Sequence, residues 1–208
     1  MVFCIYYLRA AMRRLRRLNY LLLASFGGSQ IAIGRGLRVD GGFKFYPEGS
    51  AFSIAVGNNL GVRRGFTLMI SEAAMLQIGH NVFFNNRCSI SCRSHIQIGN
   101  DCLFGENVKL YDHNHNFRDS RSLIRKQGFR DGTIKIGNNV WIGSNATILN
   151  NVNIGDNVVI GAGCLIDRDI PANTLVKQRL GLDLDDLQAG TGERLQVSQI
   201  TTMPEPTL

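Results

Sequence analysis

Apolar and polar positions repeat with a period of six residues over much of the second half of the chain, from residue 136 to residue 171. Five consecutive six-residue phrases begin with isoleucine, usually continue with glycine, and carry a small or β-branched residue in fifth place. In an α-helix the apolar phase would drift, whereas here it restarts every six residues. A fixed short period is typical of solenoids, and hexapeptide repeats are typical of parallel β-helices.

The pattern has a direct physical interpretation. The first residue of each phrase points inward, the fifth fills the space beside it, and the polar residues between them turn a corner. Asn and Gly recur at these corners because they tolerate left-handed backbone conformations at little cost. Three phrases make one triangular turn of about eighteen residues, and stacked turns bury a continuous apolar column.

The repeat also begins earlier, with less regular spacing. Aliphatic-Gly pairs open turns at Ile33, Val56, Ile78 and Ile98, separated by 23, 22 and 20 residues. The surplus predicts short extrusions around residues 43–50 and 71–74. The next gap, from Ile98 to Ile136, is 38 residues long. It predicts one further turn and a long loop over residues 116–135, and loops on rigid scaffolds are where chemistry tends to lie.

Residues 1–28 differ from everything that follows. Apolar side chains keep helical spacing at Leu8, Ala11, Met12, Leu15, Leu18 and Leu22. Arginines lie largely elsewhere around this expected basic amphipathic helix. It would cap the open end of the solenoid, and the helix over residues 1–26 would also suit attachment to an anionic membrane surface. The arginines argue against a signal peptide, and no stretch approaches transmembrane length.

Composition narrows the function classes. A chain of 208 residues with 44% hydrophobic residues can form one domain. The net charge of +7 is concentrated near the start, because no acidic residue precedes Asp40. The body has no basic run with interleaved aromatics, so nucleic acid is not expected as a partner.

The five cysteines show no disulfide pattern. Cys88, Cys102 and Cys164 fall on fifth positions of the repeat, so they are expected to be small core residues in a reducing compartment. Cys88 and Cys92 with nearby His95 could be imagined as a zinc site, but the repeat explains Cys88 without metal.

The segment that enters the long loop carries the candidate chemistry. It contains two of the four histidines, His113 and His115, and the carboxylate of Asp112 beside them. These side chains could ligate a metal or supply a general base that titrates near neutrality. The residues alone do not separate these roles.

Three features together resemble the left-handed β-helix acyltransferases. They are the hexapeptide repeat, the Asp-His-Asn-His-Asn sequence at residues 112–116, and the Val-Trp-Ile-Gly-Ser-Asn sequence at residues 140–145. The group most similar is the bacterial polysaccharide and lipopolysaccharide O-acetyltransferases. The resemblance covers about residues 30–176. It implies an all-β fold, a left-handed parallel β-helix over residues 29–176, with an N-terminal α-helix and a long extruded loop. The left hand comes from the family, since parallel crossovers are usually right-handed.

The resemblance implies that His115 is the catalytic base, because the family places its histidine at the mouth of the loop, four residues after the position of Tyr111. His115 would accept the proton of a sugar hydroxyl as the oxygen attacks an acetyl thioester. His113 is the alternative base or a helper, and Asp112 would orient either imidazole. No metal is implied.

The resemblance also implies acetyl-CoA as co-substrate, bound between subunits of a homotrimer. The family's contacts carry over to Ser144 and, one coil later, Ala162, whose small side chains let the pantetheine arm approach the backbone. Trp141 has a phase that turns it outward, as a channel wall or an interface anchor.

The C-terminal part departs from the family pattern. Residues 183–186 are mostly acidic, where relatives place a basic helix near the nucleotide end of CoA. Arg168, Lys177 and Arg179 are the expected substitutes. Residues 177–208 form a divergent segment with a polar end, which we expect to be a flexible tail.

Asn85 matches a family position near the acceptor sugar. Arg125 and Arg130, with other basic residues of the loop, could bind an anionic acceptor such as a sialic or uronic acid. The alternative is a solvated basic loop.

The expected function is acetyl transfer from acetyl-CoA to a sugar hydroxyl of a capsule or lipopolysaccharide. The enzyme would be cytoplasmic, with peripheral contact at the inner membrane through residues 1–26. The alternatives are transfer to an amino sugar or small xenobiotic, and a non-catalytic trimeric scaffold.

Overall fold

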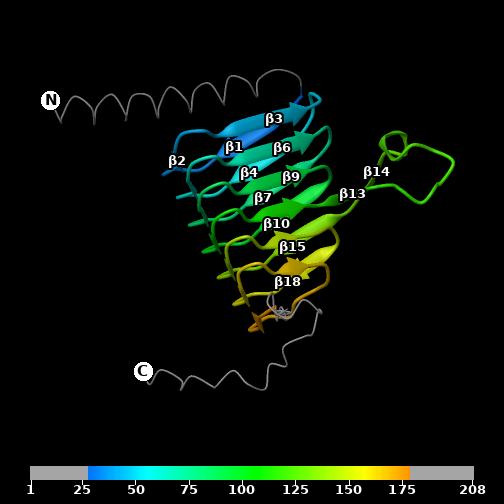
Figure 1. Ribbon diagram of the computed structural model, residues 1–208. Helices are drawn as coiled ribbons and strands as arrows, with labels where there is room; N and C mark the ends of the chain where they lie inside the picture. The colour runs from blue at the N-terminus through cyan, green and yellow to red at the C-terminus, as the bar shows by residue number, and fades with distance from the viewer. Residues whose placement is uncertain (1–27, 179–208) are drawn as a thin grey trace, which may run out of the picture. The chain divides into compact units, whose positions relative to one another are not determined.

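The structure is a computed structural model that describes residues 28–178. All but two of its strands form three parallel sheets, which are the three faces of a solenoid (Figure 1). Sheet A contains β1 (Gln30–Ile33), β4 (Ser53–Val56), β7 (Met75–Ile78), β10 (His95–Ile98), β15 (Thr133–Ile136) and β18 (Val152–Ile154). Sheet B contains β2 (Arg38–Val39), β5 (Gly61–Val62), β8 (Phe83–Phe84), β11 (Leu103–Phe104), β16 (Trp141–Ile142), β19 (Val159–Ile160) and β21 (Leu175–Val176). Sheet C contains β3 (Lys44–Glu48), β6 (Thr67–Ser71), β9 (Ser89–Cys92), β12 (Lys109–Tyr111), β17 (Thr147–Ile148) and β20 (Leu165–Ile166).

Each coil passes through sheets A, B and C in that order and stacks on the coil before it. The aliphatic residues expected to open successive turns pair in register, as in Ile33 with Val56 and Ile98 with Ile136. Ile136 pairs in turn with Ile154, one regular coil later. The expected fold class, an all-β parallel β-helix built from hexapeptide phrases, is confirmed.

The corners are formed by the residue types that the sequence predicts. Most of the non-glycine residues with positive φ are asparagines at corner positions, for example Asn139 (φ 53°) and Asn157 (φ 57°). Their side chains stack from coil to coil, because Asn139 Nδ2 donates to Asn157 Oδ1 at 2.9 Å. Gly57 is required for a different reason, since a Cβ there would lie 2.7 Å from the carbonyl carbon of Gly79.

A column of apolar side chains fills the interior. Isoleucines dominate it, and three phenylalanines interrupt it, two in sheet B (Phe84 and Phe104) and Phe66 at the corner between sheets B and C. Phe84 packs on Phe104 with ring centroids 4.2 Å apart and on Phe66 with centroids 5.0 Å apart. Cys88, Cys102 and Cys164 are buried in this column. The expectation that they are core residues is confirmed.

All surplus residues leave the stack at one corner, between sheets C and A. The steps from sheet A to B and from B to C have the same length in each full coil, as the pairings of Arg38 with Gly61 and Lys44 with Thr67 show. Part of the expected extrusion at 43–50 is not a loop, because Lys44–Glu48 forms the long strand β3. Likewise Ser71 ends strand β6. Both extrusions are therefore shorter than expected, because the long strands β3 and β6 take up part of the extra residues of their coils.

The longest excursion is a hairpin from this same corner, and it projects from the solenoid (Figure 1). Its strands β13 (His113–His115) and β14 (Phe129–Asp131) pair antiparallel, and a short 3-10 helix, η1 (Ile124–Lys126), lies between them. The hairpin spans residues 113–132, which is three residues earlier than the expected 116–135. Residues Thr133–Ile136 belong to the coil instead, because they pair with His95–Ile98.

The expected helix over residues 1–28 and the segment 177–208 lie almost wholly outside the described residues.

Inside coils one to three, at the N-terminal end, an apolar cavity of about 90 Å³ is lined by side chains such as Ile31, Leu37 and Phe45. No helix within the described range 28–178 is long and apolar enough to cross a membrane.

We predict that Phe84→Ala lowers the free energy of unfolding by about 3–5 kcal/mol, because it opens a cavity between the rings of Phe66 and Phe104. Chemical denaturation followed by far-UV circular dichroism measures this. Leu123→Ala, at an exposed position of the hairpin, is the control and should change the value by less than about 0.5 kcal/mol. Equal effects for the two variants would contradict the packing.

Candidate active site

The hairpin is anchored by a buried carboxylate at its base. Asp112 is fully buried, and its oxygens accept hydrogen bonds from the backbone N–H groups of Arg93 (2.8 and 3.1 Å) and Ser94 (2.9 Å). The Asp112 carbonyl accepts from the N–H of Gly132 at 2.7 Å, where the chain re-enters the coil. The side chain of Asp112 therefore binds the corner of the previous coil, and its backbone closes the hairpin.

His113 is oriented by the same carboxylate. Its Nδ1 lies 3.1 Å from Asp112 Oδ1, and its side chain is 15% exposed. Because a carboxylate only accepts hydrogen bonds, Nδ1 carries the proton. Of the two imidazoles that Asp112 was expected to orient, the structure places His113 on it.

His115 lies two residues further along β13 and is exposed. Its ring packs against Phe129 with centroids 4.3 Å apart. It borders a hollow of about 290 Å³ on the hairpin. The other residues around this hollow are Asn116, Phe117, Arg118, Asp119, Gln127 and Arg130. His115 is thus the histidine that faces a space where a small substrate can lie.

Arg93 joins these parts, and the sequence pattern did not single it out. Its guanidinium carbon lies 3.9 Å from the centroid of the Phe129 ring, and its Nε donates to Asp131 at 3.1 Å. Its Nη1 reaches Ser71 at 3.3 Å and Glu48 at 3.6 Å, on the corners of two earlier coils. Arg93 therefore ties the strand that supports His115 to the solenoid. Only the fold brings these partners together, so no local motif marks them.

A second group of predicted residues lies at another corner, between sheets B and C. Ser144 and Ala162 occupy adjacent coils there, and the N–H of Gly163 donates to the Ser144 carbonyl at 2.8 Å. Ser144 Oγ accepts from the N–H of Glu106 at 3.0 Å. Lys177 follows Val176, whose carbonyl accepts from Gly161, so Lys177 falls on the same corner one coil further on.

Trp141 and Asn85 lie near this second group. Trp141 is 55% exposed on the outer face of sheet B, so its predicted outward orientation is confirmed. Asn85 precedes β9 at the same corner, and its Oδ1 accepts from the N–H of Asn86 at 2.9 Å. Asn86 also borders a polar hollow of about 580 Å³ along this corner.

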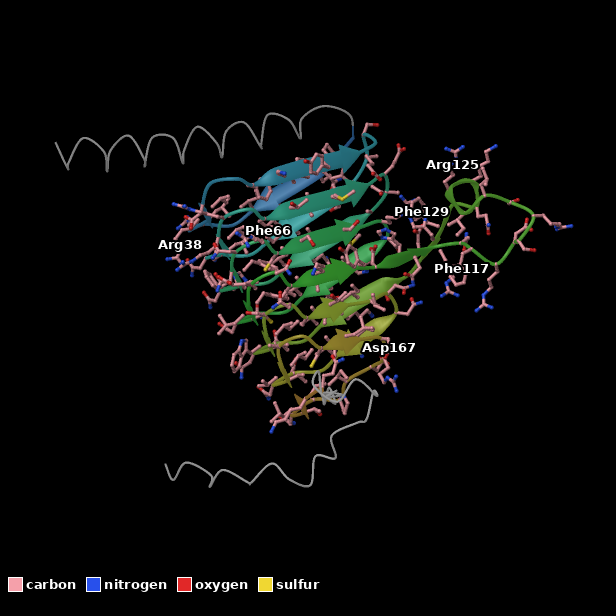
Figure 2. All side chains as sticks on the ribbon, in the orientation of Figure 1. Arg38, Phe66, Phe117, Arg125, Phe129 and Asp167 are labelled. Carbon is pink, nitrogen blue, oxygen red and sulfur yellow. The ribbon has the colours of Figure 1, made fainter. Side chains whose placement is uncertain are left out.

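The arginines predicted to bind ligands are spread over the surface. Arg168 lies between sheets C and A, and its Nε pairs with the adjacent Asp167 at 2.8 Å. Arg130 borders the hollow beside His115, whereas Arg125 lies in η1 and does not. Figure 2 shows Arg125 and Phe117 on opposite edges of the projecting hairpin.

The two groups lie at opposite edges of sheet C. The chain enters β17 from the corner of Ser144 and leaves it toward Asn150, which accepts a hydrogen bond from Asn114 of the hairpin at 2.8 Å. One chain therefore separates His115 from Ser144 and Ala162 by the width of a face.

The cysteines imagined as zinc ligands have other partners. Cys88 Sγ donates to the carbonyl of Gly105 at 3.0 Å, and Cys92 Sγ to that of Met75 at 3.4 Å. Burial raises the pKa of Cys88 to about 11 and also raises the pKa of Cys92. Within residues 28–178 no cluster of three or more His, Cys, Asp and Glu side chains could hold a metal ion.

Comparison with known proteins agrees with the repeat and the coiled fold. Residues 133–168 match the model of the bacterial transferase hexapeptide (six repeats). The matched residues lie in the regular six-residue repeats, from the start of β15 to just after β20. Over 101 residues it is 39% identical to a Schizosaccharomyces pombe protein named as a putative acetyltransferase. This match spans 48% of the present chain and 47% of the yeast protein, so the chain matches about half the length of that relative.

The fold is shared with the solved structure of an N-acyltransferase. AntD, an N-acyltransferase from Bacillus cereus solved with dTDP and 3-hydroxybutyryl-CoA, superimposes with a TM-score of 0.59 at 16% identity, over 79% of this chain and 81% of AntD. A maltose O-acetyltransferase from Clostridium difficile gives a TM-score of 0.41 at 27% identity, over 74% and 66% of the two chains. At its level of identity, the AntD likeness concerns the fold alone.

We predict that Arg93→Gln loosens the hairpin, because the substitution removes the guanidinium from the Phe129 ring and from Asp131. Amide hydrogen exchange of residues 113–131 should accelerate at least severalfold, while exchange in sheet B stays unchanged. Arg63→Gln removes an arginine that lies 5.8 Å from the Phe83 ring on sheet B, and it should leave the hairpin as in the wild type. Unchanged hairpin exchange in Arg93→Gln would contradict this role.

We also predict a loss of stability at alkaline pH that depends on Cys88. In the unfolded chain this thiol ionises near its ordinary pKa of 9.0, whereas in the folded chain it stays protonated up to about pH 11. The unfolded state therefore gains stability as the pH rises through this window. The free energy of unfolding should fall between pH 9 and pH 11, and the fall should be smaller in Cys88→Ala. Parallel curves for the two proteins would contradict the buried thiol.

Proposed function

We propose that the protein transfers acetyl from acetyl-CoA to a sugar hydroxyl, with His115 as general base. The observation that carries this proposal is the position of His115. It lies where the longest excursion leaves an otherwise regular coil, and its imidazole borders a hollow with no hydrogen bond to another described residue. The hexapeptide match and the named acetyltransferase relative support the reaction class.

In the proposed reaction, His115 takes the proton of the acceptor hydroxyl as its oxygen attacks the thioester carbonyl. The carbon–sulfur bond then breaks, an acetyl ester forms, and the thiolate of CoA leaves and takes up the proton. A positioned base of this kind contributes about 10²–10⁴ in rate. Alignment of the two substrates contributes further.

The corner of Ser144 and Ala162 suits the thioester substrate. Both side chains are small, and a Cβ added at Gly163 would meet nothing within 4 Å, so the backbone there is open to a narrow ligand. Lys177 lies on the same corner and offers a cation for a phosphate. Trp141 would wall the groove beside them. Arg168 lies on the corner of the hairpin, so in this arrangement it belongs to the opposite side of the groove.

The proposed assembly is a homotrimer in which the hairpin of one copy meets the corner of Ser144 of the next. The outer face of sheet B supports association, because it carries an in-register row of apolar side chains. Leu103 (50% exposed), Trp141 and Leu175 (57% exposed) belong to this row. Exposed apolar rows of this kind mark interaction surfaces. We place the enzyme in the cytoplasm, where a capsule or lipopolysaccharide unit would be its acceptor, and residues 1–26 at the inner membrane.

We predict that His115→Ala lowers kcat by about 10²–10⁴ and leaves the KM for acetyl-CoA within about twofold, because only proton transfer is lost. Release of free CoA thiol with a panel of saccharides measures this.

His113→Ala is the matched variant and should lower kcat less, because its imidazole binds Asp112 and acts through the shape of the hairpin. The reverse order would assign the base to His113. Absence of acetyl-CoA binding by the wild type, measured by calorimetry, would reject the enzyme and leave a trimeric scaffold. Transfer to amino sugars but not to hydroxyls would reject O-acetylation.

A further inference from the structure

The hollow beside His115 is lined by charged side chains that the proposed acetyl transfer alone does not require. It has a volume of about 290 Å³, near the lower limit for ligand pockets. Its lining comes from both sides of the hairpin, with Arg118 following β13 and Arg130 on β14. A space of this size suits one sugar unit and its substituent.

Most polar groups around the hollow already bind one another. Gln127 Nε2 donates to the carbonyls of Asp119 (2.9 Å) and Ser122 (2.8 Å), and Gln127 Oε1 accepts from the N–H of Asp119 at 3.2 Å. Asn116 Nδ2 donates to the carbonyls of Gln127 (3.1 Å) and Phe129 (3.2 Å). These bonds hold the shape of the loop and leave those donors occupied.

The acidic residue of the hollow is also occupied. The Asp119 carboxylate accepts from the N–H of Arg121 at 3.0 Å, from its Nε at 3.3 Å, and from Ser122 Oγ at 3.1 Å. The backbone bond from Arg121, followed by the Ser122 hydroxyl, lowers the pKa of Asp119. Its charge is therefore matched by Arg121, which lies outside the lining of the hollow.

Two guanidinium groups are left over. In the part of the chain that the structure describes, neither Arg118 nor Arg130 has a carboxylate within ion-pair distance or a hydrogen bond from its side chain. Arg118 contacts only the Phe117 ring, at 5.8 Å from its centroid. Planar guanidinium groups bind carboxylate and phosphate through paired hydrogen bonds. The hollow thus offers an unmatched positive charge next to the proposed base.

We infer that the acceptor is an anionic saccharide, whose carboxylate or phosphate binds Arg118 and Arg130 while its hydroxyl meets His115. This inference rests on the proposed function and names its substrate class. Arg125, which the sequence also suggested for this role, lies in η1 outside the hollow and takes no part. The two guanidinium groups would fix which hydroxyl of the acceptor reaches the imidazole.

The test compares Arg118→Gln and Arg130→Gln with the matched control Arg125→Gln. Acceptors are paired so that they differ mainly in charge: glucose against glucuronate for a carboxylate, and glucose against glucose 1-phosphate and UDP-glucose for a phosphate. We expect the KM for the preferred charged acceptor to rise at least about tenfold in the two variants, as for a lost charged hydrogen bond. The KM for acetyl-CoA and the control variant should stay at wild-type values. The acceptor pair whose KM changes in the variants shows whether the two arginines bind a carboxylate or a phosphate.

A binding measurement separates this inference from the proposed function. Calorimetric titration of full-length protein with glucuronate, glucose 1-phosphate and UDP-glucose needs no turnover, and hydrogen exchange of residues 113–131 checks that each variant keeps its hairpin. Anion binding that is lost in Arg130→Gln, without acetyl transfer to any acceptor, would support the anion site and reject the transferase. Acetyl transfer to neutral and charged acceptors with equal KM, unchanged in both variants, would overturn the anion site and leave the transferase standing.

Discussion

The structure depends on one constraint, which is that inward side chains of successive coils stack directly on one another. Phe84 lies on Phe104 as Ile98 lies on Ile136, and each such pair excludes water from the column between the sheets. Two of the three corners keep a fixed length because any added residue there would shift a whole strand out of register and turn its apolar face outward. Residues beyond the repeat therefore leave at the third corner.

That constraint explains how much of the fold the sequence could predict. The pairing of the turn-opening residues, the asparagines at the corners, the buried cysteines and the length of the excursion all follow from a period of six. The ends of the excursion do not, because His113–His115 pairs with Phe129–Asp131 in an antiparallel strand pair that no hexapeptide marks. Regular spacing also could not show that β3 would absorb part of the extra length of the first coil.

The candidate site divides in the same way. Spacing alone identified the loop and its histidines, and resemblance singled out His115. The burial of Asp112 and the stacking of Arg93 on Phe129 depend on contacts between residues far apart in the chain. Charge on the loop was visible from the sequence, but it could not show which arginines are neutralised. Arg121 is neutralised by Asp119, and Arg125 lies in η1, outside the hollow.

The backbone hydrogen bond between Gly132 and Asp112, where the hairpin leaves and rejoins the coil, has an evolutionary consequence. The stacked coils on either side of this junction do not depend on how many residues lie between these two groups. The stability of the stacked coils is thus shielded from insertions, deletions and exchanges of the whole loop. A protein built in this way can exchange the loop proposed to bind the acceptor by recombination at one junction, while the surface proposed for the thioester remains untouched.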